Sequence, residues 1–127
     1  CRKQTFLQWA HSCLEDKKSV DIYTDEFRNV VYVDDVVKVI SFFVEQHGDD
    51  EDLTGVYNMG GKDRVNRYDV VLEIAKHCGL DASHANPAEK AKLPKGKVDS
   101  PPDISMDISK LERTTGIKMR GMEEMVG

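Results

Sequence analysis

Four segments of the chain carry apolar residues at the three- and four-residue spacing of one helix face. They predict amphipathic helices over residues 5–16, 36–46, 68–79 and 107–116, followed by an amphipathic turn over residues 119–126. In the second of these helices, four apolar residues are expected to share one face: Val36, Ile40, Phe43 and Val44.

The third helix has the clearest boundaries. Asn66 can cap its first turn, Asp69 can return a hydrogen bond from the third helical position, and Gly79 can end it. Asp107 and Gly116 predict boundaries of the same kind for the helix that follows. Both helices are therefore expected to begin at a capping side chain and to end at a glycine.

Short runs rich in β-branched residues separate the helices. Residues 20–23, 30–33 and 55–59 are predicted to be strands. Residues 62–64 are expected to form a polar loop, and residues 81–102, which hold all four prolines, a long surface loop. The alternation of helices and strands predicts one α/β domain over residues 1–127, in which some strands pair in parallel.

Composition excludes several classes of protein. The 23 acidic residues outnumber the 18 basic ones, so the charge of −5 disfavours nucleic acid and anionic membrane as partners. Every apolar run is too short to span a bilayer. The three cysteines have no paired spacing, which favours a reducing compartment, and a cytoplasmic protein is expected.

Most motifs that carry chemistry are absent from the sequence. It has no glycine-rich phosphate loop, no tyrosine followed four residues later by lysine, no serine-nucleophile elbow and no metal-binding histidine spacing. The pair Gly60-Gly61 is interpreted as the end of a strand. No catalytic residue, cofactor site or metal site is therefore predicted within this chain.

Four ordered blocks resemble the extended short-chain dehydrogenases that act on nucleotide sugars. Residues 28–37 are similar to the R-x-F-x-Y-V-x-D-V block, and residues 55–61 to the G-x-Y-N strand. The helix at residues 68–79 and the P-D-x-x-x-D-x-x-K-L pattern at residues 102–111 follow in the family's order. Within that family, the likeness is to the C-terminal, substrate-binding half of the dTDP-4-dehydrorhamnose reductase-like proteins.

The resemblance implies an α/β fold that is the C-terminal substrate-binding part of an extended short-chain dehydrogenase, with most of the NAD(P)-binding Rossmann sheet absent. It implies the substrate-binding part of an NAD(P)-dependent sugar-nucleotide reductase, whose cofactor is bound mainly by a half missing from this chain. The chain alone is then expected to be inactive. A non-catalytic regulatory subunit with the same fold, like that of methionine adenosyltransferase, is the alternative, and a homo-oligomer or a regulatory partner is left open.

The resemblance also names candidate substrate-binding residues. Arg28 stands where the family's arginine contacts the substrate diphosphate, and Tyr32 also occupies a family position. Asp35 is interpreted as a helix cap. The alternatives are that Arg28 packs along a strand or pairs with Asp25 or Glu26, and that Tyr32 packs on a sheet.

One position departs from the family pattern. Ser100 and Pro101 stand where many nucleotide-sugar enzymes have a second arginine, which puts nucleotide-sugar specificity in doubt. Lys95 and Lys97 are candidate substitutes for that arginine. The competing expectation is that all four lysines of the loop are solvated: Lys90, Lys92, Lys95 and Lys97.

Overall fold

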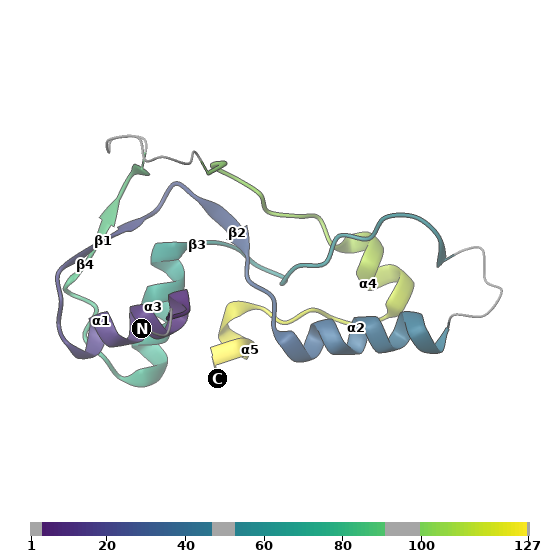
Figure 1. Ribbon diagram of the computed structural model, residues 1–127, viewed down its shortest axis with the longest axis horizontal. Helices are drawn as coiled ribbons and strands as arrows, with labels where there is room; N and C mark the ends of the chain where they lie inside the picture. Colours follow the sequence, from purple (N-terminus) through teal and green to yellow (C-terminus); the bar gives the residue numbers. More distant parts are fainter. Residues whose placement is uncertain (1–3, 47–52, 91–99, 127) are drawn as a thin grey trace.

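The computed structural model describes residues 4–46, 53–90 and 100–126 (Figure 1). The helices are α1 (Phe6–Glu15), α2 (Val33–Glu45), α3 (Arg67–Cys78), α4 (Ser109–Thr115) and α5 (Met122–Val126). The strands are β1 (Val20–Tyr23), β2 (Phe27–Asn29), β3 (Arg64–Asn66) and β4 (Ala85–Ala88).

The strands form two short sheets. β1 pairs with β4 in parallel, from Val20 opposite Ala85 onward, which confirms the expected parallel pairing. β2 pairs with β3 in the antiparallel sense, and a parallel bridge joins Phe27 to Asp103. Both sheets connect segments that lie far apart in the sequence.

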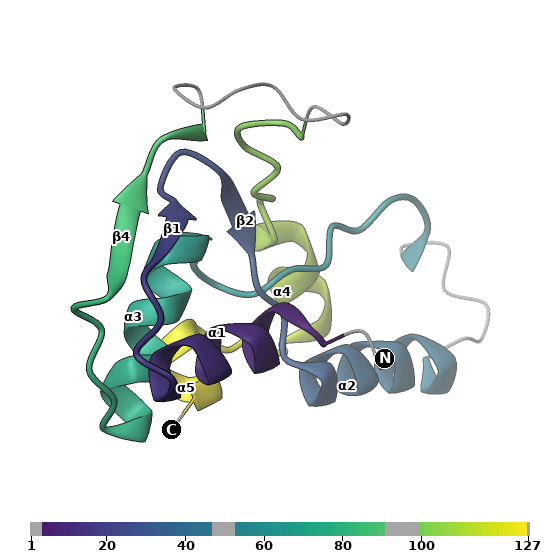
Figure 2. The ribbon, with the colours of Figure 1, turned by 60° about the vertical axis from the view of Figure 1, so that its left-hand side comes forward.

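Apolar side chains gather in two clusters. The larger cluster lies where α1, α3 and α5 meet β1 and β4, and its most buried members are Ala10, Leu14, Ile22, Val70, Val71 and Ala75. The smaller joins α2 to α4 through Val39, Leu111 and Met119. Figures 1 and 2 both show α2 and α4 side by side, and Figure 1 shows this pair away from α1 and α3.

The expected boundaries of α3 and the expected end of α4 are confirmed, whereas the cap expected at Asp107 is wrong, because α4 begins after Ile108 with no side-chain cap. Asn66 and Asp69 form a reciprocal capping box at the start of α3, and Gly79 ends it with a φ of 63°. The Asp107 carboxylate accepts a hydrogen bond from the Ser109 backbone N–H at 2.8 Å, and Gly116 ends α4 with a φ of 68°. These ends depend on chemistry within a few residues, so the sequence shows them directly.

The strand predicted at residues 30–33 is wrong. The strand is β2, which lies a few residues earlier, and Val33 already begins α2. The cause is pairing, because β3 and the segment around Asp103 offer their backbone groups to residues 27–29.

Two loop predictions are wrong in part, because each loop contains strand residues. β4 lies within the expected loop at residues 81–102, and β3 begins in the expected loop at residues 62–64. Among the described residues β4 pairs with β1 alone, so Pro87 is tolerated in it as in an edge strand, which needs fewer backbone N–H donors.

Residues 55–59 form no strand with any part of the chain that the structure describes. Instead α4 holds this segment, because the Lys110 ammonium donates to the Val56 carbonyl at 3.1 Å. The Val56 side chain is 82% exposed.

Helix α2 buries a different face from the expected one. Val39 is fully buried, whereas Ile40 and Val44 are exposed, so the face expected for them is wrong. The exposed residues form an apolar row at helical spacing, here called the α2 stripe, with side chains between 52% and 69% exposed: Val33, Val37, Ile40 and Val44. α2 is apolar on two sides, and the side that packs on Leu111 and Met119 is the buried one.

None of the helices in the described ranges is long and apolar enough to cross a membrane.

Candidate functional site

Arg28 is a half-buried residue of β2 whose guanidinium, among the described residues, donates to two neutral carbonyl groups. Its Nη1 donates to the Phe27 carbonyl at 2.6 Å and its Nη2 to the Pro101 carbonyl at 3.0 Å. Within the described ranges Arg28 forms no ion pair with Asp25 or Glu26, so that alternative is wrong. No carboxylate among the described residues pairs with the guanidinium, which has further N–H donors for a ligand.

The carboxylate of Glu26 is occupied by another cation. Glu26 is only 3% exposed, and the Lys90 ammonium lies 2.8 Å from its Oε1. The Ser100 hydroxyl also donates to Glu26. Burial alone would raise the pKa of Glu26, but the hydrogen bonds from Lys90 and Ser100 and the nearby Lys90 charge hold that pKa below its usual value.

Lys90 was expected to be solvated with the other loop lysines, and that expectation is wrong. Its ammonium lies 2.7 Å from the Ser100 hydroxyl oxygen and 3.1 Å from the Ser100 carbonyl oxygen. The sequence could not show that Lys90 meets Glu26, because the contact joins distant parts of the chain. Lys92, Lys95 and Lys97 lie outside the described residues.

A second set of contacts fixes the segment after Pro101 on β2. The Phe27 backbone N–H donates to the Pro102 carbonyl at 2.7 Å. The Arg64 guanidinium lies 3.5 Å from the centre of the Phe27 ring and donates from Nε to Asp103 at 2.9 Å. Pro101, whose carbonyl accepts from Arg28, is thus followed by two residues that are attached to β2 and β3.

Asp103 is the carboxyl group of this region whose pKa departs most from its usual value. Hydrogen bonds from the hydroxyl and the backbone N–H of Ser105, together with those from Arg64, lower the pKa of Asp103 to about 2. Asp103 is therefore a carboxylate at any physiological pH and keeps its hold on Arg64.

Tyr32 follows β2 and lies at the start of α2. Its half-buried ring is covered by the Arg120 guanidinium, whose central carbon is 4.4 Å from the ring centre. No hydrogen bond or cation–π contact joins Arg28 to Tyr32 among the described residues. The structure therefore places the two predicted substrate residues beside different neighbours, Pro101 and Arg120.

Asp35 is structural, but not as the expected cap. α2 has no side-chain cap, and the Asp35 carboxylate, which is 1% exposed, accepts from the Arg120 backbone N–H at 3.0 Å. Its other oxygen is 3.4 Å from Arg120 Nε. Asp35 therefore attaches the start of α2 to Arg120, a residue that sequence reasoning missed.

A hollow of about 290 Å³ lies beside Arg120. Two carboxylates face it, and each accepts a hydrogen bond from a nearby backbone N–H: Glu112 from Met119 and Glu124 from Gly121. The hollow thus presents groups of both charges, with walls formed by Lys62, Glu112, Lys118, Met119, Arg120 and Glu124.

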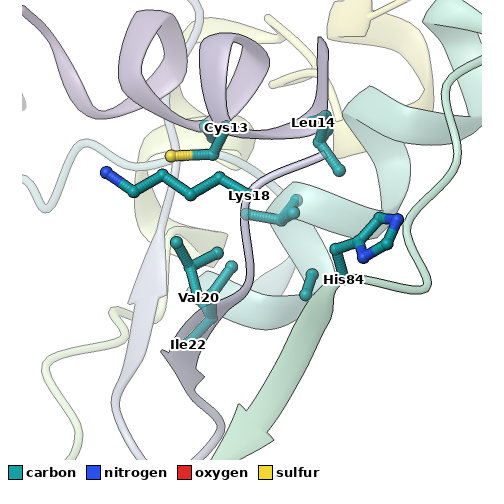
Figure 3. Close-up of a pocket in the computed structure, with 9 residues that line it drawn as sticks. Cys13, Leu14, Lys18, Val20, Ile22 and His84 are labelled. Carbon is teal, nitrogen blue, oxygen red and sulfur yellow. The ribbon is translucent and has the colours of Figure 1, made fainter. Parts of the chain in front are cut away.

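Figure 3 shows a second hollow, next to α1 and β1. Its walls are mainly apolar, with Cys13 and Leu14 on one side and Val20, Ile22 and His84 on the other. It has no room for a water molecule. It is a small packing gap rather than a ligand site.

Gly60 and Gly61 serve packing rather than phosphate binding. A Cβ atom on Gly61 would lie 1.8 Å from the Val30 carbonyl oxygen, and one on Gly60 would lie 3.0 Å from the Asn29 Cβ. The glycines let two backbone segments approach closely. Gly60 and Gly61 therefore offer no phosphate cradle, and no group of three or more His, Cys, Asp or Glu side chains among the described residues could hold a metal ion.

Comparison with solved structures identifies the fold. The NADP complex of dTDP-4-dehydrorhamnose reductase from Bacillus anthracis superposes on 99% of this chain with a TM-score of 0.80 and 13% identity. The NAD complex of UDP-glucuronic acid 4-epimerase from Bacillus cereus covers 96% with a TM-score of 0.65 and 18% identity. The chain is thus an α/β structure resembling the substrate-binding part of extended short-chain dehydrogenases, with only short sheets.

This chain spans only part of each relative. It corresponds to 42% of the reductase and 35% of the epimerase. Among curated proteins, methionine adenosyltransferase 2 subunit beta from Xenopus tropicalis is 28% identical over 96 residues, which are 76% of this chain and 28% of that protein.

A family model gives the match that extends along the chain. The model of the RmlD substrate binding domain covers residues 2–127, which include β2, Arg28 and the segment that holds it. The predicted resemblance to the dTDP-4-dehydrorhamnose reductase-like proteins is thereby confirmed, and the chain belongs to the RmlD substrate binding domain family.

Proposed function

We propose that this chain is the substrate-binding part of a longer NAD(P)-dependent sugar-nucleotide reductase similar to dTDP-4-dehydrorhamnose reductase. One observation carries the proposal: a half-buried guanidinium, Arg28, is held by two neutral carbonyls and by no carboxylate among the described residues. A planar fork of N–H donors that pairs with no carboxylate among these residues suits the diphosphate of a nucleotide sugar.

The chemistry is divided between two parts of the proposed protein. The sequence has no glycine-rich phosphate loop and Gly60-Gly61 serves packing, so NAD(P), which would supply the hydride, is assigned to polypeptide outside this chain. The role of this chain is to bind and orient the substrate. By itself the chain is expected to reduce no keto-sugar nucleotide.

Three features support a missing contact partner. The α2 stripe is exposed, Val56 is exposed, and the buried Tyr57 hydroxyl has no hydrogen-bond partner among the described residues. A buried hydroxyl without a partner is costly, and an apolar row of this kind normally packs on another element. We therefore place the cofactor-binding half against α2 and residues 55–59.

We also propose that the protein is cytoplasmic. Cys13 and Cys78 are both free thiols, one buried and one exposed. Unpaired cysteines are usual in a reducing compartment.

The test is the affinity of the full-length protein for dTDP-rhamnose, measured by calorimetric titration. Arg28→Ala should weaken binding by about 1.5 to 3 kcal/mol, the range for hydrogen bonds to charged groups, with little change in stability. Arg28→Lys should recover only part of the affinity, because a point charge replaces a fork. Arg113→Ala, which removes an exposed arginine of α4, should leave binding unchanged.

A second candidate is a non-catalytic regulatory subunit with the same fold. It is favoured by the match to methionine adenosyltransferase 2 subunit beta and by Ser100-Pro101, which replaces an arginine typical of nucleotide-sugar enzymes. For that function, dTDP-rhamnose should bind no worse to Arg28→Ala than to the unmodified protein. Such a result would remove Arg28 from the site.

A further inference from the structure

We propose that Lys90 and Glu26 are positioning residues for Arg28, because together they fix the backbone of residues 100–101 that holds its guanidinium. The inference rests on the proposed role of Arg28 in ligand binding. It adds two residues that touch no ligand themselves and act only through Arg28.

The segment at residues 100–101 is held by two cations from different parts of the chain. Lys90, which follows β4, donates to both the carbonyl and the hydroxyl oxygen of Ser100, at 3.1 and 2.7 Å. Arg28, in β2, donates to the carbonyl of the next residue, Pro101, at 3.0 Å. The position of the Pro101 carbonyl therefore depends on how firmly Ser100 is held.

Pro101 is the acceptor that gives the Arg28 guanidinium its direction. The other acceptor, Phe27, is the residue next to Arg28 and moves with it, whereas Pro101 belongs to a separate segment. An arginine side chain has many rotamers, and ordering it when a ligand binds costs conformational entropy. A fixed Pro101 carbonyl orders the guanidinium before the ligand arrives.

Glu26 is the buried residue that anchors Lys90 and Ser100. Its carboxylate is 3% exposed and accepts from both Lys90 and Ser100, so three side chains meet at one buried point. A buried carboxylate is stable only with close partners, which defines the position of the Lys90 ammonium. Glu26 also immediately precedes β2, so Glu26 and Arg28 belong to one short stretch of backbone.

The experiment is a double-mutant cycle in the full-length protein, with dTDP-rhamnose as the probe and calorimetric titration as the measurement. Lys90→Met should raise the Kd about two- to tenfold, the range for the entropy of one side chain that is no longer ordered beforehand. The same change in an Arg28→Ala background should have almost no further effect. Lys90→Arg, which keeps a cation beside Glu26, should recover part of the affinity.

Two further variants keep the test decisive. Lys76→Met removes a lysine that pairs with Glu73 at 3.2 Å on α3, and it should leave the Kd unchanged. If Lys90→Met does not fold, the double variant Glu26→Gln/Lys90→Met leaves no uncompensated buried charge and should still raise the Kd.

The outcomes separate the two proposals. A normal Kd for the Lys90 variants, or Lys90 and Arg28 losses that simply add, overturns the positioning role while Arg28 remains a ligand residue. Lower melting temperatures with unchanged Kd also overturn it, because they show a purely structural ion pair. An unchanged Kd for Arg28→Ala overturns the proposed function and the positioning role together.

Discussion

Gly61 is the position where a single methyl group meets the least space. Its Cβ would lie 1.8 Å from the Val30 carbonyl oxygen, which is backbone and cannot rotate away. Gly116 differs, since its Cβ would meet nothing within 4 Å and only its φ of 68° opposes a side chain. The two glycines therefore resist substitution for separate reasons, close packing and backbone conformation.

We expect Gly61→Ala to lower the free energy of unfolding by about 3 kcal/mol, the upper end of the usual cost of overpacking. Gly116→Ala should cost only about 1 to 2 kcal/mol, the penalty for a left-handed residue with a Cβ. Urea unfolding of both variants measures the difference. Equal losses would show that the Val30 backbone moves aside at little cost.

The candidate site residues came from the resemblance to a family. Arg28 and Tyr32 could be named from one sequence block, since the block itself carries the resemblance. Lys90 and Arg120 could not, because their roles come from Glu26 and Asp35, which are distant in sequence. The sequence around Lys90 does not show whether its ammonium meets a buried carboxylate or solvent.

Among the elements, α3 has the most complete set of local signals. Asn66 accepts from the Asp69 N–H at 2.8 Å, and Asp69 accepts from the Asn66 N–H at 3.3 Å. Val65 and Val70, on either side of the cap, both belong to the larger apolar cluster. The start of α3 is thus fixed by hydrogen bonds and by burial at the same point.

Asn66→Ala should therefore destabilise the protein by about 1 kcal/mol, the usual loss when a helix cap is removed. Asn66→Asp should cost much less, because a carboxylate accepts the same hydrogen bond and suits the helix N-terminus. Thermal or urea unfolding tests both variants. Equal losses for the two would mean that the cap contributes little to α3.

Strands were predicted less well than helices, for a reason that β2 illustrates. Residues 30–33 have the stronger β preference, yet residues 27–29 form the strand, because β3 and the Asp103 segment lie beside them. A helix satisfies its hydrogen bonds within itself, whereas a strand needs a neighbour. The same dependence explains β4, whose proline-containing sequence becomes a strand only beside β1.

At the scale of the whole molecule, the two apolar clusters differ in how well they are enclosed. α1, α3 and α5 surround the larger one, whereas α2 buries Val39 against α4 and leaves the α2 stripe uncovered. The hydrophobic pattern of α2 showed that it is amphipathic but not which of its two apolar sides is buried. Which side of α2 is buried depends on the elements that the whole fold packs against it.

The α2 stripe leads to a prediction with opposite signs in two contexts. The double variant Val37→Gln/Val44→Gln should reduce self-association of residues 1–127, because it removes exposed apolar surface. In the full-length protein it should instead lower the free energy of unfolding by about 1.5 to 3 kcal/mol per valine, the value of a buried side chain. Sedimentation and urea unfolding measure the two effects, with Leu72→Gln on α3 as the control. Unchanged stability of the full-length variant would show that the stripe faces solvent there too, and the cofactor-binding half would have to pack elsewhere.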